Sequence, residues 1–128
     1  EGDFMDIYAE YQKKILTAAE AAELVQSDDW VDSASAVPSD TLTPVNYFDR
    51  ALAARKDELT GVNVRNAISA QPVSIVEEDP EQKAFTYNLW HCSGLDRKYL
   101  DQGFAYHEPM LFRDCGSYYS RGFARVTI

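Results

Sequence analysis

Cysteine and basic residues are scarce in this chain of 128 residues, and each shortage excludes a class of protein. Two cysteines are too few to hold a small secreted domain together through disulfides, which favours a reducing compartment. Twelve lysines and arginines stand against 21 aspartates and glutamates, so the net charge is −9. A surface with this excess of carboxylates repels the phosphate backbone of nucleic acids, and we expect no nucleic-acid partner.

Long apolar runs are also missing. No stretch approaches the ~20 apolar residues that a membrane-spanning helix requires. The first residues have neither the basic end nor the apolar segment of a signal peptide. The hydrophobic fraction of 45% and the aromatic fraction of 12% are typical of a chain with a packed core. We therefore expect a cytoplasmic protein with no membrane partner, of a size that suits one compact domain.

Segments with a helical pattern alternate with short apolar segments along the chain. Thr17 followed by Glu20 is the pattern of a capping box, which predicts a helix from there to Val25. A second helix is expected between Thr43, as its cap, and Gly61, just past its end. Further expected elements are strands at 30–34, 62–68, 85–90, 104–107 and 123–128, a helix at 93–102, a helical turn at 118–121, and loops at 35–43 and 71–83. This alternation predicts an α/β fold with an open, mostly parallel sheet and flanking helices.

Residue patterns that hold metals, phosphates or nucleophiles are weak or absent. The candidate metal ligands are His91, Cys92, His107 and Cys115. Their spacing fits no zinc site, so no metal is expected, and both cysteines are expected to be small buried hydrophobic residues. The six glycines form neither a P-loop nor a dinucleotide fingerprint. Ser93 is expected to cap the following helix rather than act as a nucleophile, and the acidic run 77–79 to be a solvated loop.

Several segments together carry a resemblance to a known family. The most specific is FTYNLWHCSGLDRK at 85–98; the others are LTAAEAA at 16–22, DDWVD at 28–32, ALAARKDEL at 51–59, VNVR at 62–65, and EPM through YYSRG at 108–122. They resemble the N-terminal domain of family I coenzyme A transferases, in the acetyl-CoA hydrolase/transferase group. Within that group they are similar to the branch of butyryl-CoA:acetate and 4-hydroxybutyrate CoA-transferases. The resemblance covers nearly the whole chain.

The resemblance implies an open α/β domain that is the first of two similar CoA-transferase domains. In this family a glutamate attacks the acyl-CoA thioester and becomes a glutamyl-CoA thioester, which passes CoA to an acceptor acid. That glutamate and the glycine-rich CoA loops belong to the second half, so the resemblance implies no catalytic residue in this chain, which alone would be inactive. The residues that the resemblance assigns to the acyl pocket are Ser33, Ala36, Pro38, Asn88, His91 and Ser93.

The resemblance also implies the ligands and partners of the complete protein. The substrates would be a coenzyme A thioester and a short-chain carboxylate, with no tightly bound cofactor. The other partners would be the C-terminal CoA-transferase domain and further copies of the chain in a homo-oligomer. Two alternatives stay open. One is an acetyl-CoA hydrolase of the same family, in which water reaches the intermediate; the other is a stand-alone α/β binding domain without catalysis.

Both ends of the chain give rise to expectations. Residues 1–4 precede Met5, so we expect them to be vector-derived and the native sequence to start at Met5. Residues 5–128 would then be the N-terminal part of the first domain. The last residues, up to Ile128, are apolar and β-rich and end without a turn signal, so we expect the chain to be cut within a strand.

Overall fold

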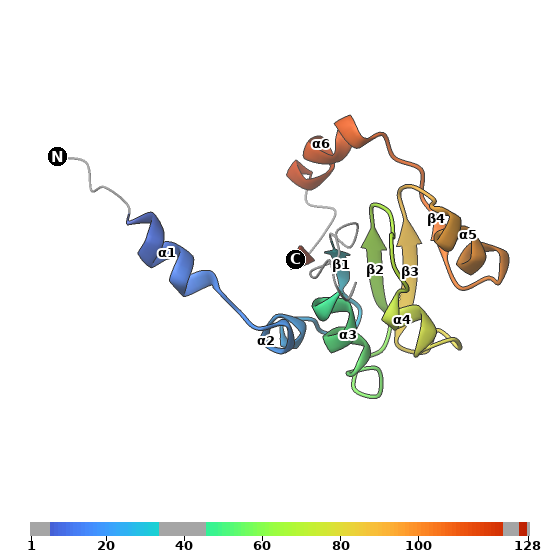
Figure 1. The fold of residues 1–128 in the computed structure, drawn as a ribbon, viewed down its shortest axis with the longest axis horizontal. Coiled ribbons are helices and arrows are strands. Elements are labelled where there is room, and N and C mark those ends of the chain that lie inside the picture. The colour runs from blue at the N-terminus through green and yellow to red at the C-terminus, as the bar shows by residue number, and fades with distance from the viewer. Residues whose placement is uncertain (1–5, 34–45, 122–125, 128) are drawn as a thin grey trace.

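Five parallel strands form one sheet in the computed structural model, which describes residues 6–33, 46–121 and 126–127 (Figure 1). The strands are β1 (Trp30–Ser33), β2 (Val62–Asn66), β3 (Phe85–Leu89), β4 (Tyr106–His107) and β5 (Val126–Thr127). Their order across the sheet is β4-β3-β2-β1-β5, and every neighbouring pair is parallel. The predicted α/β class with an open, parallel sheet is confirmed.

The connections place helices on both faces of this sheet. The helices are α1 (Ile7–Lys14), α2 (Ala18–Glu23), α3 (Tyr47–Ala53), α4 (Ser74–Glu77), α5 (Gly94–Asp101), the 3-10 helix η1 (Phe112–Asp114) and α6 (Cys115–Ser120). The steps from β1 to β4 all run in one direction, so right-handed crossovers put α3, α4 and α5 on one face. The step from β4 to β5 runs the other way and puts α6 on the opposite face. None of the helices in the described segments is long and apolar enough to cross a bilayer.

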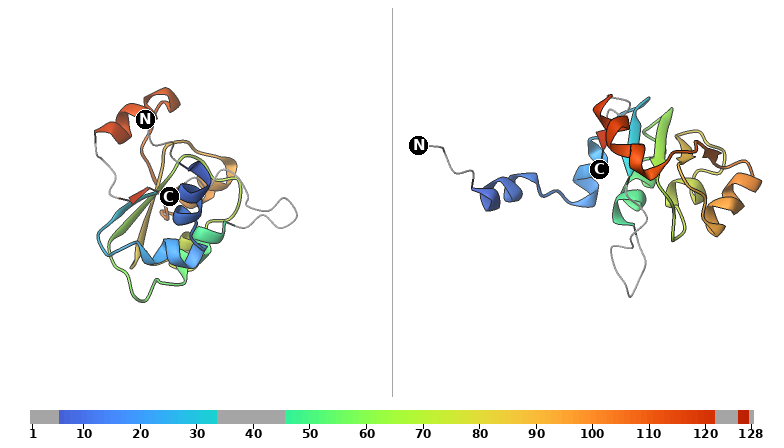
Figure 2. Two further views of the ribbon diagram at one scale, coloured as in Figure 1. Left: turned by 90° about the vertical axis from the view of Figure 1, so that its left-hand side faces the viewer. Right: turned by 90° about the horizontal axis from the view of Figure 1, so that it is seen from above.

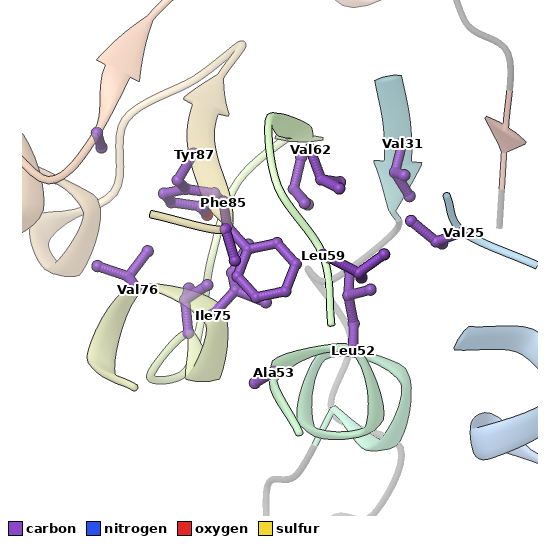
Figure 3. Close-up of a cluster of buried hydrophobic side chains, with 14 of the residues drawn as sticks. Val25, Val31, Leu52, Ala53, Leu59, Val62, Ile75, Val76, Phe85 and Tyr87 are labelled. Carbon is purple, nitrogen blue, oxygen red and sulfur yellow. The ribbon is translucent and has the colours of Figure 1, made fainter. Parts of the chain in front are cut away.

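The hydrophobic core lies between the first face of the sheet and helices α2 to α4. Successive strand residues point to opposite faces, so every second residue of β1, β2 and β3 enters this core. Figure 3 shows the cluster, which includes Val25, Val31, Leu52, Leu59, Val62, Ile75, Phe85 and Tyr87. The core thus fixes the strands from one side and leaves their carboxyl ends at an edge.

Two capping boxes are present, and the one at Thr17 was predicted. The Thr17 hydroxyl accepts a bond from the Glu20 amide at 3.2 Å, and the Glu20 carboxylate accepts one from the Thr17 amide at 2.7 Å. At α5, the Ser93 hydroxyl and the Asp96 carboxylate exchange the same pair of bonds, each at 3.0 Å. The prediction that Ser93 caps a helix is therefore confirmed, and Gly103 follows that helix with a φ of +77°.

The second predicted helix is shorter than its sequence pattern suggested. Helix α3 ends at Ala53, and the chain continues in tighter turns that bring Leu59 into the core. The Arg55 guanidinium stabilises this change of direction. It donates to the backbone carbonyl of Ala22 in α2 and, at 3.0 Å, to that of Val25 just after α2. The α3 N-cap is Asn46, whose side-chain oxygen accepts from the Asp49 amide; the predicted cap, Thr43, lies outside the described residues.

Other local predictions are wrong or incomplete. The predicted loop at 71–83 contains α4, and no helix was predicted where α1 lies. In the acidic run, Asp79 is buried and accepts bonds from the amides of Lys83, Ala84 and Phe85. The cysteines are not buried: Cys92 is exposed and Cys115 is half-buried.

The limits of three other elements also shift. Helix α6 begins at Cys115, ahead of the predicted turn at 118–121. Strand β4 covers only the end of the predicted strand at 104–107. Of the strand predicted at 123–128, the described part is β5.

Helix α1 extends away from the sheet as an arm (Figures 1 and 2). The side chains of Ile7, Tyr8 and Tyr11 on this helix are 78%, 70% and 60% exposed. Asp6 caps the helix by accepting bonds from the amides of Tyr8 and Ala9. The arm thus presents apolar side chains that the described residues leave uncovered.

We predict that the chain self-associates through this arm, because exposed apolar surface gains free energy when a second surface covers it. The Tyr11→Glu variant should shift the light-scattering mass of a concentrated sample towards that of a monomer. Gln12→Glu adds the same charge at an exposed polar position of α1 and should leave the mass unchanged. A wild-type chain that stays monomeric at high concentration would contradict the prediction.

Candidate functional site

The candidate site lies at the carboxyl ends of the parallel strands, the edge at which open α/β sheets bind ligands. Strand β1 ends at Ser33, β2 at Asn66 and β3 at Leu89. The strand order changes direction between β1 and β5, so the crevice beyond Ser33 is the topological switch point. The described residues form one hollow along this edge beside β1 and β2 and another beyond β3 and β4.

A buried polar network supports the first hollow. The Asn66 amide donates to the Ser69 hydroxyl at 2.9 Å and to the Tyr87 hydroxyl at 3.1 Å, and these two hydroxyls lie 2.6 Å apart. The Ser69 backbone amide donates to the Asp96 carboxylate at 3.1 Å. Burial raises the pKa of Tyr87 far above its ordinary value, so its phenol stays neutral. These groups bond mainly to one another and hold the loop after β2 in place.

The first hollow combines an apolar wall with polar groups. It is lined by Ser33, Asn46, Asp49, Val64, Asn66, Ser69, Gln71, Pro72, Val73, Ile75 and Tyr87. About 10 Å³ of it admits the centre of a water molecule, which is room for about one water. The Gln71 side chain is 4% exposed, and within the described chain neither its amide nitrogen nor its amide oxygen has a hydrogen-bond partner.

Asp49 is the one acidic residue in this lining, and it caps a helix. Its carboxylate accepts bonds from the backbone amides of Ser74 at 2.5 Å and Ile75 at 3.3 Å. It thereby replaces the side-chain cap that Val73 cannot supply to α4. Burial raises the pKa of Asp49 above its ordinary value, against the bonds from Ser74 and Ile75, which lower it.

The second hollow is an open groove beyond β3 and β4. It is lined by Trp90, His91, Cys92, His107, Pro109, Met110 and Leu111. Although several of these side chains ligate metals elsewhere, no group of three or more His, Cys, Asp or Glu residues in the described segments is placed to hold a metal ion.

The structure separates the residues predicted for the acyl pocket. Ser33 lines the first hollow, whereas His91 lines the groove. Asn88 is buried and its amide donates to the Thr86 carbonyl at 3.3 Å, and the Ser93 hydroxyl is used as a helix cap. The remaining two predicted residues, Ala36 and Pro38, lie outside the described residues.

Sequence reasoning missed the polar residues that follow β2. Asn66, Ser69 and Gln71 lie at or just after the end of a strand that was correctly predicted. Polar residues at the carboxyl end of a predicted parallel strand are the signal that could have found them.

The opposite face of the sheet carries a buried ion pair. The Arg65 guanidinium binds both Asp32 oxygens, at 2.6 and 2.8 Å, and donates to the Tyr118 hydroxyl of α6. The central guanidinium carbon, Cζ, lies 5.2, 5.3 and 4.4 Å from the ring centres of Trp30, Trp90 and Tyr118, within the range of cation–π contacts. Burial opposes this charge, but the bonds and the attraction to Asp32 outweigh it and raise the pKa of Arg65.

Comparison with known proteins places this geometry in a family context. Residues 1–127 match the family described as acetyl-CoA hydrolase/transferase N-terminal domain. The chain is 39% identical over 115 residues to a protein named "Butyryl-CoA:acetate CoA-transferase" from Anaerostipes caccae, which covers 90% of this chain and 25% of that protein. It is 40% identical over 119 residues to "Probable butyrate:acetyl-CoA coenzyme A-transferase" from Syntrophomonas wolfei, which covers 88% and 26%.

Two further proteins are more distantly similar to this chain. "Succinyl-CoA:cyclohexane-1-carboxylate CoA transferase" from Geobacter metallireducens is 34% identical over 113 residues, covering 82% of this chain and 24% of its own. This chain thus spans about a quarter of the length of these curated relatives. The crystal structure of RipA from Yersinia pestis has the same fold, with a TM-score of 0.60 at 16% identity, covering 87% of this chain and 27% of that chain.

The first prediction from these contacts concerns the ion pair. Asp32→Asn leaves the Arg65 charge buried without its counter-ion, which should lower the free energy of unfolding by roughly 3–5 kcal/mol in urea titrations. Adding Arg65→Met should restore part of that loss. Glu108→Gln is the matched control, because this carboxylate is half-exposed and 3.7 Å from the guanidinium. A loss no larger for Asp32→Asn than for the control would contradict the prediction.

The second prediction concerns Asp49 and pH. Because the native pKa of Asp49 is raised above the ordinary 3.8, the native state holds this proton more tightly than the unfolded state. The stability contributed by the protonated form is therefore lost as pH rises from about 4 through the raised pKa. Asn keeps an oxygen for the Ser74 amide and does not titrate. The stability of Asp49→Asn relative to wild type should thus increase from pH 4 to 7, measured by urea unfolding.

Asp101→Asn is the control for this pH series, since it removes a carboxylate from the exposed end of α5. A stability difference between Asp49→Asn and wild type that stays constant over the range would show that Asp49 does not titrate as inferred.

Proposed function

We propose that the full-length protein transfers coenzyme A from butyryl-CoA to acetate. This chain belongs to the acetyl-CoA hydrolase/transferase family, because it matches the N-terminal domain of that family over residues 1–127. The observation that supports this most is the identity of about 40% to two proteins named for butyrate and acetate CoA transfer, over nearly nine-tenths of this chain. The full-length protein is then an enzyme, and this chain contributes the N-terminal part of its first domain.

The proposed reaction uses a glutamate that lies outside this chain. Its carboxylate attacks the thioester carbonyl and expels the CoA thiolate, which leaves an acyl–glutamyl anhydride. The thiolate then attacks the glutamyl carbonyl, so butyrate leaves and a glutamyl-CoA thioester forms. Acetate attacks this thioester and expels the thiolate again. The thiolate finally attacks the acetyl group of the new anhydride, which yields acetyl-CoA and restores the glutamate.

In this scheme the present chain binds and orients the acyl group and takes no part in bond making. The residues proposed for the acyl pocket are Ser33, Ala36, Pro38, Asn88, His91 and Ser93. Among them Ser33 has the clearest support, because it lines a hollow at the carboxyl ends of β1 and β2. The partners proposed for the complete protein are the acyl-CoA, a short-chain carboxylate, the C-terminal domain and further copies of the chain, in the cytoplasm.

A thioester hydrolase is the second candidate, because the matching family description names both hydrolases and transferases. The two reactions share the glutamyl-CoA intermediate. They differ in whether water or a carboxylate attacks it. A binding domain without catalysis has less support, since each curated relative named above is called a CoA-transferase.

The test uses the full-length protein with butyryl-CoA, with and without acetate. We expect acetyl-CoA to form only when acetate is present, at the rate at which butyryl-CoA disappears. Without acetate, intact-mass measurements should find CoA attached covalently to the protein. Loss of thioester at the same rate with and without acetate would identify a hydrolase. If the butyryl-CoA thioester is stable both with and without acetate, the result would favour a binding domain without catalysis.

A further inference from the structure

The face of the sheet opposite the hydrophobic core, here called the second face, carries a row of side chains across its three central strands. Trp30 on β1, Asn63 on β2 and Thr86 on β3 are register partners. They alternate with core residues, so they point away from the core. All three are half-buried, whereas Val31 and Val62, their neighbours on the core side, are 0% exposed. The row thus keeps access to solvent in the middle of the sheet.

The described residues cover the second face near the carboxyl ends of the strands. In this part of the chain, the connection from β4 to β5 is the one that crosses the second face, and it contains α6. Tyr118 of α6 packs on Arg65 and, with ring centres 5.6 Å apart, on Trp90. Figure 1 shows α6 at the end of the sheet towards which the strands point. The row at Trp30 lies on the other side of Arg65, nearer the amino ends of the strands.

A sheet of parallel strands is found almost exclusively with both faces covered. The first face meets this condition through the core and its helices, and the second face meets it at α6. The row of Trp30, Asn63 and Thr86 therefore calls for one more element, which the described residues do not supply.

The length of the relatives indicates where this element comes from. This chain spans about a quarter of the length of the curated relatives. The matching family is described as an N-terminal domain, so the rest of a protein of that length follows the part matched here. The segment that follows β5 is the first that is available to cover the second face.

The strand order places that segment on the correct face. Strand β5 lies at the edge of the sheet and pairs with β1, so its other side presents unpaired backbone groups. Consecutive elements are usually neighbours in space, which favours pairing of the next strand with this free side. The step from β5 outward has the same direction as the step from β4 to β5. A right-handed crossover then puts the connecting helix on the second face, as it does for α6.

The charges on the second face determine which side chains this helix can present. Arg65 and Asp32 form a closed ion pair, and the row itself contains no charged side chain. A charge buried against it would lack a partner, which costs free energy. A helix about 10 Å wide covers two strands that lie about 4.8 Å apart, here β1 and β2. Its contacts would therefore centre on Trp30 and Asn63.

We propose that the segment following β5 in the full-length protein forms a helix that packs uncharged side chains on Trp30 and Asn63, and then a strand on the free side of β5. The second face is thus an internal docking surface for a later part of the same chain. This inference rests on the sheet and on the length of the relatives, and it is independent of the proposed CoA transfer.

The first test measures the reaction of an introduced thiol with iodoacetamide in the full-length protein, by mass spectrometry of the peptide that carries it. Asn63→Cys places the thiol under the proposed helix. Thr60→Cys is the control, because residue 60 is exposed just before β2 and outside the row. Each rate is divided by that of the same variant unfolded in urea. We expect Asn63→Cys to be slowed by more than about thirtyfold relative to Thr60→Cys, since the helix must open first. A smaller difference would overturn the proposal.

The second test identifies the covering element and needs no variant, so it also decides the matter if Asn63→Cys fails to fold. In a crystal structure of the full-length wild type, a helix from the segment directly after β5 of the same chain should lie on Trp30 and Asn63. An uncovered row would show the proposal to be wrong. So would a row covered by a second copy or by a segment from elsewhere in the chain. Neither test involves a substrate, so a failure of the proposed CoA transfer would be seen separately.

Discussion

The buried pair of Arg65 and Asp32 is the interaction on which the two-faced architecture of this sheet depends. The two residues are direct register partners on β1 and β2, so their side chains leave the same face side by side. Closing the bidentate contact fixes the pairing of the two central strands and gives α6 a partner through Tyr118. The aromatic rings around the guanidinium replace the water that it has lost. The other face carries the apolar core.

Hydrogen bonds within the protein organise the carboxyl edge of the sheet. Nearly every polar side chain there is satisfied by another: Asn66 by Ser69 and Tyr87, and Asp49 by the start of α4. A site built this way is rigid before any substrate arrives, which reduces the entropy lost on binding. Gln71 stands out because it alone is left over among these groups.

Sequence reasoning succeeded where the determining contacts are local. The capping boxes at Thr17 and Ser93 join residues three apart, and the alternation in β2 and β3 reports burial directly. It failed where a distant group contributes: Arg55 bonds to the carbonyls of Ala22 and Val25 just past the end of α3, and Asp49 caps α4 from 25 residues away. The site residues divide in the same way. Ser33 follows from its place at a strand end, whereas the isolation of Gln71 depends on how its neighbours pair in three dimensions.

The strand order has a consequence for the sequence of events in folding. Strands β1 to β4 pair with neighbours that are close along the chain, so they can assemble progressively as a growing sheet. Strand β5 pairs with β1, and that contact closes the loop from Val31 to Val126, which carries the largest entropic cost in the sheet. The crevice at the end of β1 is flanked on both sides only after this closure. During synthesis on the ribosome, this pairing would form only after residues 126–127 had emerged.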